Sequence, residues 1–216
     1  MLLERPNVGT NLKLRKVNLP KEMSVELAEL VGIQFGDGNL YKNKKYNYIL
    51  TYCFNSKEKW LHNHTTNIFL KQFGHKLKKR QIKDSAISLS IHSKIICYFF
   101  HENFQLPFGK KENLSIPKKF KKDKKLLFGF LRGLYWTDGC KFIKKDRHYR
   151  YPIIKITNKS KKFIEQIQEI LLKFGFRARI NAKNNSGFGF DVVLHGTNQV
   201  KMWEEKIMKR SGDTGI

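Results

Sequence analysis

The feature that most constrains this chain is a nine-residue segment that it carries twice. The first copy reads Leu-Val-Gly-Ile-Gln-Phe-Gly-Asp-Gly at residues 30–38, and the second reads Leu-Arg-Gly-Leu-Tyr-Trp-Thr-Asp-Gly at residues 131–139. Each copy is largely apolar, places two small residues one helical turn apart and ends in Asp-Gly. The copies occupy corresponding places in two similar halves, so the sequence predicts an internally duplicated fold.

The small residues of each copy indicate how the two segments pack. Glycine inside a helix costs about 1 kcal/mol relative to alanine, so Gly32 and Gly36 need a compensating role. In the second copy Gly133 and Thr137 have the same spacing. Two helices that approach each other closely through these residues would provide that role.

The acids that end the two segments indicate a metal site. Asp37 and Asp138 each stand where a helix should stop, before a glycine suited to a left-handed terminating residue. A carboxylate there faces the negative end of the helix dipole, and two neighbouring carboxylates repel each other. A shared divalent cation would offset both penalties, and Mg²⁺ prefers such oxygen ligands.

On these residues the chain resembles the LAGLIDADG homing endonucleases of the single-chain, two-repeat type. The nine-residue signature maps onto residues 30–38 and 131–139, and its acidic eighth position is filled in both copies. The resemblance implies an α+β fold of two pseudo-symmetric αββαββ(α) repeats. The signature helices would pack at the centre, and antiparallel sheets would form a DNA-binding saddle. Gln34, Phe35, Tyr135 and Trp136 depart from the consensus at positions that affect helix packing.

The order of elements supports the duplication. Helix, hairpin, helix, hairpin and helix are expected in each half, with signature helices from the Ser24 cap to about Asp37 and from Lys125 to Asp138. The string His62-Asn63-His64 lies on one expected helix, where we expect solvated side chains. The expected parts are an N-terminal arm at 1–23, a first repeat at 24–103, a basic linker at 104–125, a second repeat at 126–208 and a tail at 209–216.

The resemblance also implies an active site. Asp37 and Asp138 would bind Mg²⁺, with Mn²⁺ as a substitute, helped by the backbone carbonyls of Gly36 and Thr137. One phosphodiester in each DNA strand would be hydrolysed, which leaves 3′ overhangs. Lys141 matches a position where relatives place a basic group near the phosphate. Asn55 and Asn158 match positions that order solvent.

The charge of the chain indicates a polyanionic partner. Lysine and arginine number 43 against 18 acids, which gives a formal net charge of +25. Such a surface binds nucleic acid with strong salt dependence. The expected DNA contacts are strand and hairpin residues, mostly basic: Lys42, Lys44, Tyr46, Lys78, Arg80, Lys83, Lys144, Arg147, Arg150, Lys155, Arg177, Arg179, Asn181 and Lys183.

Residues 176–183 show the pattern of a DNA-reading strand most clearly. Phe176, Ala178, Ile180 and Ala182 alternate with the polar or basic side chains of the intervening positions. One face would pack on helices, while the other presents groups able to read base edges in the major groove.

Two other functions remain open from the sequence. An RNA maturase that assists intron splicing, or a DNA-binding protein of the same fold that does not cut, would also need the basic surface. Neither needs two acids, so the acids favour a Mg²⁺-dependent endonuclease that acts as a monomer on double-stranded DNA, with intron RNA as a further possible partner. Three scattered cysteines and the lack of a signal peptide or apolar span indicate an intracellular protein, in the cytoplasm and nucleoid or an organellar matrix.

Overall fold

The computed structural model describes residues 1–7, 17–43, 45, 47–146, 148–182 and 189–209. The chain divides into two compact units. Unit 1 comprises Met1–Lys111 and Pro117–Thr137, and unit 2 comprises Glu112–Ile116 and Asp138–Ile216. Each unit contains one antiparallel sheet of four strands, so the predicted α+β class is confirmed. Among the described residues, no helix is both long and apolar enough to cross a membrane.

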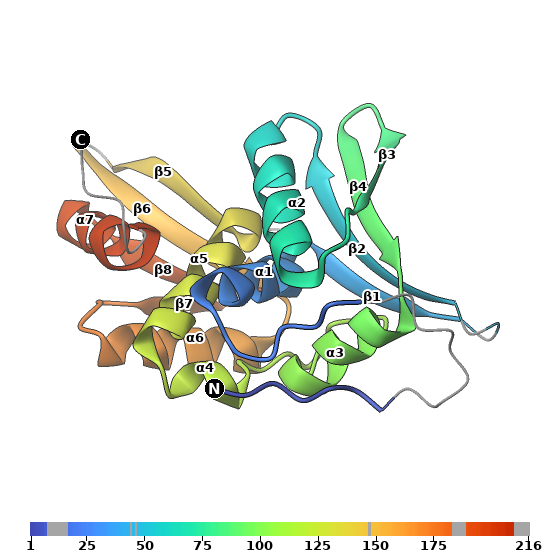
Figure 1. Ribbon diagram of the computed structural model, residues 1–216. Helices are drawn as coiled ribbons and strands as arrows, with labels where there is room; N and C mark the ends of the chain where they lie inside the picture. The colour runs from blue at the N-terminus through green and yellow to red at the C-terminus, as the bar shows by residue number, and fades with distance from the viewer. Residues whose placement is uncertain (8–16, 44, 46, 147, 183–188, 210–216) are drawn as a thin grey trace. The chain divides into compact units, whose positions relative to one another are not determined.

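Unit 1 follows the predicted order of elements (Figure 1). Its elements are α1 (Val25–Gly36), β1 (Gly38–Lys42), β2 (Tyr48–Asn55), α2 (Lys59–Phe73), β3 (Lys78–Lys83), β4 (Ala86–His92), α3 (Lys94–Phe104), α4 (Lys118–Lys121) and α5 (Lys124–Asp138). The strands pair in the order β1-β2-β4-β3.

Local sequence explains where the elements of unit 1 begin and which side they bury. Ser24 and Ser93 cap α1 and α3 by accepting hydrogen bonds from the backbone N–H groups three residues later. Along β2, buried side chains alternate with more exposed ones from Tyr48 to Asn55. Tyr48 contacts Tyr98 of α3, with ring centroids 5.5 Å apart, so this buried face is the one that the helices cover. The opposite face of the sheet is called the open face below.

The two signature helices, α1 and α5, pack backbone to backbone. A Cβ atom on Gly32 would lie 2.1 Å from the carbonyl oxygen of Phe130. A Cβ atom on Gly133 would lie 2.0 Å from the carbonyl oxygen of Glu29. No side chain fits at either position, which explains the glycines that the sequence places there despite their cost in helix propensity.

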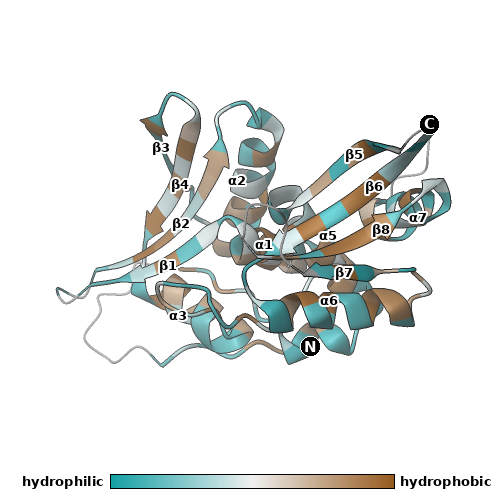
Figure 2. Cartoon of the chain, turned by 180° about the vertical axis from the view of Figure 1, so that it is seen from behind, coloured by the Kyte–Doolittle hydropathy of each residue, from teal (hydrophilic) through white to brown (hydrophobic). Residues whose placement is uncertain are grey.

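Unit 2 repeats the order of sheet pairing. Its elements are β5 (Gly139–Asp146), β6 (Tyr149–Asn158), α6 (Lys161–Lys173), β7 (Arg179–Ala182), β8 (Phe190–His195), α7 (Thr197–Trp203) and a final π-helical turn at Glu204–Met208. The strands pair in the order β5-β6-β8-β7. Figure 2 shows apolar and polar residues alternating around α6, which buries Phe163, Ile164, Ile167 and Leu171.

Several local predictions differ from the structure. The expected linker contains a short helix, α4, because Phe120 is buried and stacks on Phe104 and Phe130. The expectation that His62 is solvated is wrong, since its side chain stacks on Phe54 and only 2% of it is exposed.

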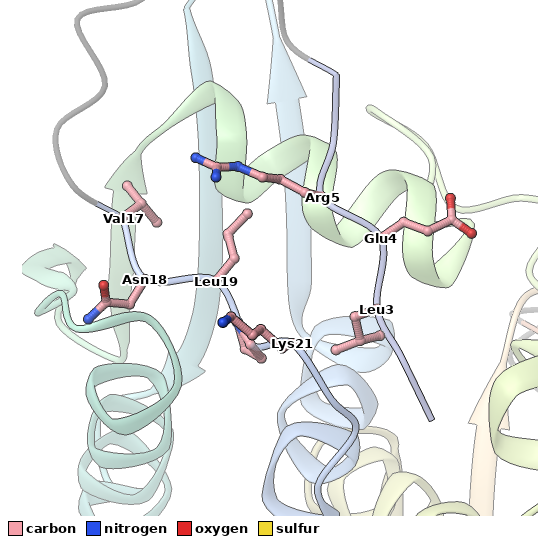
Figure 3. A pocket seen from close by; sticks show the side chains of 8 residues that line it. Leu3, Glu4, Arg5, Val17, Asn18, Leu19 and Lys21 are labelled. Carbon is pink, nitrogen blue, oxygen red and sulfur yellow. The ribbon is translucent and has the colours of Figure 1, made fainter.

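The N-terminal arm is more regular than the sequence suggests. The residues that flank the undescribed segment 8–16 run antiparallel, with Leu3 N–H donating to the carbonyl oxygen of Lys21 at 2.9 Å. The buried Asn103 of α3 holds the arm by two hydrogen bonds of 2.9 Å to the backbone of Glu4. Figure 3 shows Arg5 and Leu19 extending into the space between the two segments, whereas Glu4 points away.

Candidate active site and nucleic-acid interface

The backbone of Asp37 is fixed at the junction of α1 and β1. Its N–H donates to the carbonyl oxygen of Ile33 at 3.0 Å, as the last bond of the helix. Its own carbonyl accepts a hydrogen bond from the N–H of Cys53 on β2, also at 3.0 Å. The half-buried acid is therefore positioned by both a helix and a sheet.

A lysine occupies the carbonyl end of α1 directly beside Asp37. The ammonium of Lys111 donates to the carbonyl oxygens of Phe35 at 2.7 Å, of Gln34 at 3.4 Å and of Gly36. These carbonyls form the negative end of the helix dipole, which attracts a cation. The carbonyl of Gly36 is one of the expected metal ligands. Because it already accepts a hydrogen bond from an ammonium group, this helix end attracts cations.

Lys111 reaches this place because its loop is bound to the edge of the sheet. Phe108 forms a β-bridge with Leu40, and Gly109 N–H donates to the carbonyl oxygen of Leu40 at 2.8 Å. The residue lies in the segment expected to be a linker, where its position depends on how the loop docks. Sequence reasoning missed it, and the only signal was the density of lysines in residues 104–125.

Cys53 is a further side chain beside Asp37 that the sequence did not single out. The pKa of its thiol is raised, first by burial and then by the negative charge of Asp37, while Lys111 acts in the opposite direction. The thiol is therefore protonated at neutral pH. Asp37 and Lys111 therefore both lie within electrostatic reach of this thiol.

In unit 2, the structure brings together two of the residues that the sequence singled out. Asn158, at the end of β6, donates from Nδ2 to Oδ2 of Asp138 at 2.9 Å. The Oδ1 atom of Asn158 accepts a hydrogen bond from the backbone of Ser160 at 3.0 Å, which fixes the orientation of the amide. In unit 1, the exposed Asn55 uses its Oδ1 atom to accept a hydrogen bond from the backbone of Lys57.

Lys141, whose catalytic role stays a prediction, forms an ion pair in the structure. Its ammonium donates to Oε1 of Glu204 at 2.6 Å, and both side chains are about half exposed. The contact with Glu204, in the final helical turn, shows that Lys141 lies on the face of this sheet that the helices cover, and the opposite face is the open face of unit 2. Lys141 pairs with Ile154 of β6. Directly paired residues share a face, so both side chains point toward the helices and away from the open face of unit 2.

The ends of α1 and α5 offer oxygen atoms as metal ligands. Asp37 and Asp138 supply carboxylates, and the end of α1 supplies carbonyl groups that already hold a cationic side chain. In the described part of the chain, no three His, Cys, Asp or Glu side chains gather into a ready-made cage. Mg²⁺ commonly binds through one or two carboxylates and retains water, so the carboxylate and carbonyl oxygens at the end of α1 fit such an ion. The carbonyl of Thr137 stays a predicted ligand.

The expected DNA contacts of unit 1 divide between the two faces of its sheet. Lys78, Arg80 and Lys83 pair with Ser90, Ser88 and Ala86, and all three lie exposed on the open face. Lys42 lies on the helix-covered face, with its ammonium 5.7 Å from the ring centroid of Tyr48. Lys44 and Tyr46 lie outside the described residues.

The contacts expected in unit 2 divide in the same way. On the open face lie Lys144, Lys155, Arg179 and Asn181, the last two at alternate positions of β7. Arg177 precedes β7 and is exposed, whereas Arg150 has the orientation of the helix-covered face. Arg147 and Lys183 lie outside the described residues.

One acid on the open face of unit 2 was not anticipated. Asp191 of β8 is 4% exposed and accepts a hydrogen bond from Thr157 Oγ1 at 2.6 Å. Its other oxygen lies 3.8 Å from the ammonium of Lys155. The acid therefore orients one of the expected DNA contacts. An isolated Asp in a strand gives no sequence signal for this role.

Comparisons with known proteins agree with the fold and the signature. A family model described as LAGLIDADG-like domain matches residues 125–208. The homing endonuclease I-DmoI, solved in complex with DNA and Ca, superposes with a TM-score of 0.64 and 21% identity, over 87% of this chain and 91% of that one. At this identity the likeness shows the fold.

Two curated relatives come from Methanocaldococcus jannaschii. A replication factor C small subunit is 32% identical over 68% of this chain, and a glutamine–fructose-6-phosphate aminotransferase is 27% identical over 75%. The chain spans only 9% and 14% of their respective lengths. The similarity therefore concerns a segment of each relative and not the whole protein.

Proposed function

We propose that this chain, which has the fold of the LAGLIDADG homing endonucleases and a LAGLIDADG-like domain at residues 125–208, is a site-specific endonuclease that cuts both strands of a long DNA target. The observation that carries the proposal is the end of α1. There Asp37, three backbone carbonyls and the Lys111 ammonium gather beside a sheet whose open face carries exposed basic side chains.

The comparisons support DNA as the substrate. I-DmoI was solved with DNA and Ca and also with DNA and Mn. The two curated relatives have unrelated names. Neither name therefore describes the activity of the segment that resembles this chain. A net charge of +25 suits a polyanion. We expect the enzyme to act as a monomer in the compartment that holds its DNA.

The chemistry at each acid follows from its neighbours. A divalent cation, when bound, supplies Lewis acidity and neutralises charge on the scissile phosphate. Asp37 and Asp138 are the proposed carboxylate ligands, with carbonyl groups such as that of Gly36 in support. Lys111 is placed to stabilise the negative charge that develops on the phosphate oxygens during hydrolysis. We expect the products to carry 3′ overhangs.

Asn158 has a positioning role beside Asp138. Its amide donates to the carboxylate at 2.9 Å and is itself held by the backbone of Ser160. The hydrogen bond fixes the orientation of the Asp138 carboxylate. The second Asp138 oxygen then has a defined orientation toward a cation or a water molecule.

The experiment that tests the proposal is cleavage of a randomised duplex library with Mg²⁺ or Mn²⁺. Native protein is compared with Asp37→Asn, Asp138→Asn and a control, Glu102→Gln, which alters an exposed acid of α3. The expected result is recovered ends that share one long site, lost with EDTA and in both Asp variants but kept in the control. Cleavage that survives both Asp substitutions would contradict the assigned site.

The alternative functions give different outcomes of the same experiment. Site-selective, salt-sensitive DNA binding without any cleavage would identify a DNA-binding protein of this fold. Binding to structured RNA in preference to duplex DNA would identify a maturase.

A further inference from the structure

The open faces of the two sheets carry the same row of three side chains. In unit 1, Tyr41 of β1 pairs with Ile49 of β2, which pairs with His92 of β4. In unit 2, Phe142 of β5 pairs with Ile153 of β6, which pairs with His195 of β8. Directly paired residues present their side chains on the same face. Each row therefore crosses three strands as an aromatic ring, an isoleucine and a histidine.

The rows lie on the open faces and not on the faces that the helices cover. Tyr41 and Ile49 alternate with the buried Leu40 and Leu50, which belong to the helix-covered side. In unit 2, Ile153 alternates with Ile154, which pairs with Lys141 and shares its helix-covered face. The rings of Tyr151 and His195, 6.1 Å apart, show that these two neighbours also share the open face.

The aromatic residue of each row is well exposed to solvent. Tyr41 is 46% exposed and Phe142 is 42% exposed, although both stand in regular strands. The isoleucine beside Phe142 is only 2% exposed, so it forms an apolar floor. An exposed aromatic ring at the same place on both open faces, among basic side chains, points to a contact with an apolar part of the ligand.

The apolar group that duplex DNA offers in its major groove is the 5-methyl group of thymine. Phosphates and sugars call for basic or polar side chains, and the other base edges call for hydrogen bonds. The histidine at the end of each row can supply such a bond to an adjacent base. The pKa of His195 is lowered, first by burial and then by Lys144 and Arg179, so its ring is neutral at pH 7 and both donates and accepts.

We propose that the two rows are matching base-reading elements that each select a thymine, through its methyl group, in one half of the DNA target. The inference rests on the proposed function and names part of the sequence that the site reads. Each aromatic stands four residues after the acid of its unit. At about 3.3 Å per residue this is roughly 13 Å along the strand, a length that spans about four base pairs of B-DNA.

The test begins with the site preference of native protein, measured by selecting bound duplexes from a randomised library in Ca²⁺. Phe142→Ser and Tyr41→Ser are selected in parallel. The control is Ile143→Ser, which removes an exposed apolar side chain, 57% exposed, from the same strand but from the opposite face. Deoxyuridine, which lacks the methyl group, then replaces thymine at each selected position of the best site.

Native protein should prefer thymine at one position in each half, and Phe142→Ser and Tyr41→Ser should each lose that preference in a different half. Replacing the thymine by deoxyuridine should weaken native binding about fourfold, the effect of one buried methyl group. The same replacement should leave the matching variant unchanged, while Ile143→Ser should behave as native protein.

Two outcomes would overturn the inference, and they are distinguishable. Site-selective binding that is unaffected by deoxyuridine and by both Ser variants would reject the thymine rows and leave the endonuclease standing. The absence of any site-selective duplex binding would reject the endonuclease and the rows with it.

Discussion

Arg132 of α5 donates from Nε to Oε1 of Glu29 on α1 at 2.6 Å, and both side chains are at most 4% exposed. The other oxygen of Glu29 lies 3.1 Å from Nε2 of His64. This network crosses the packed signature helices beside the glycine contacts. It fixes how the two helices meet by satisfying charges that have no access to water.

Removal of one partner from this ion pair should destabilise the fold strongly. Arg132→Met leaves Glu29 buried without its cation, and we expect a loss of about 3–5 kcal/mol in the free energy of unfolding. Urea unfolding followed by circular dichroism measures it. The control is Lys71→Met, which breaks an exposed pair with Glu26 and should cost at most about 1 kcal/mol. Equal effects of the two variants would show that the buried pair has no special role.

The glycine contacts of the signature helices should not accept even a methyl group. In Gly32→Ala the new Cβ would lie 2.1 Å from the carbonyl oxygen of Phe130, so the helices must separate. We expect destabilisation of about 3 kcal/mol or loss of soluble protein, at the upper end of overpacking costs. Asn67→Ala introduces the same residue at an exposed position of α2 and should change stability by less than about 0.5 kcal/mol. A stable Gly32→Ala would refute the close packing.

Lys111 and Lys141 should differ in their effect on cleavage. Lys111→Met removes the ammonium beside Asp37, and we expect single-turnover cleavage to slow by about 10²–10³-fold, as when a charge-stabilising donor is lost. Lys141→Met removes a half-exposed partner of Glu204 and should slow cleavage by less than about tenfold. If Lys141→Met slowed cleavage more than Lys111→Met, the catalytic role would belong to Lys141, as the family resemblance implies. Binding of uncut duplex, measured in Ca²⁺, separates a lost contact from a lost catalytic group.

Periodicity and the duplicated signature were sufficient to predict the fold. The glycine spacing predicted the close packing of α1 on α5, because small residues one turn apart leave a flat helix face that a second backbone can approach. Alternation along residues 176–183 predicted that Arg179 and Asn181 share one face of a strand, as the register of β7 shows. These features are local, and a sequence states local preferences directly.

The parts of the site that the sequence did not reveal depend on contacts between distant segments. Lys111 reaches Asp37 only because Phe108 and Gly109 bind to Leu40. Lys141 was predicted to lie near the phosphate because it follows Asp138 closely in the sequence. Which face of the sheet it occupies depends on its pairing with Ile154. The two aromatic rows also become visible only when three strands are aligned.

The last prediction concerns Cys53, whose thiol can report on the site without any cleavage. Burial and the Asp37 carboxylate raise its pKa above the ordinary value of 9.0, and Lys111 lowers it. In metal-free buffer, the rate of alkylation by iodoacetamide should therefore still be rising above pH 9, because only the thiolate reacts. Asp37→Asn removes a negative charge, so the thiolate forms at lower pH and alkylation at pH 8 should be faster. Lys111→Met removes a positive charge and should make it slower.

Glu102→Gln, which alters an exposed acid of α3, is the control and should leave the rate of Cys53 alkylation unchanged. Peptide mass spectrometry separates Cys53 from Cys97, whose pKa burial raises to about 12. Shifts in the same direction in both site variants would show that Cys53, Asp37 and Lys111 do not form one electrostatic site.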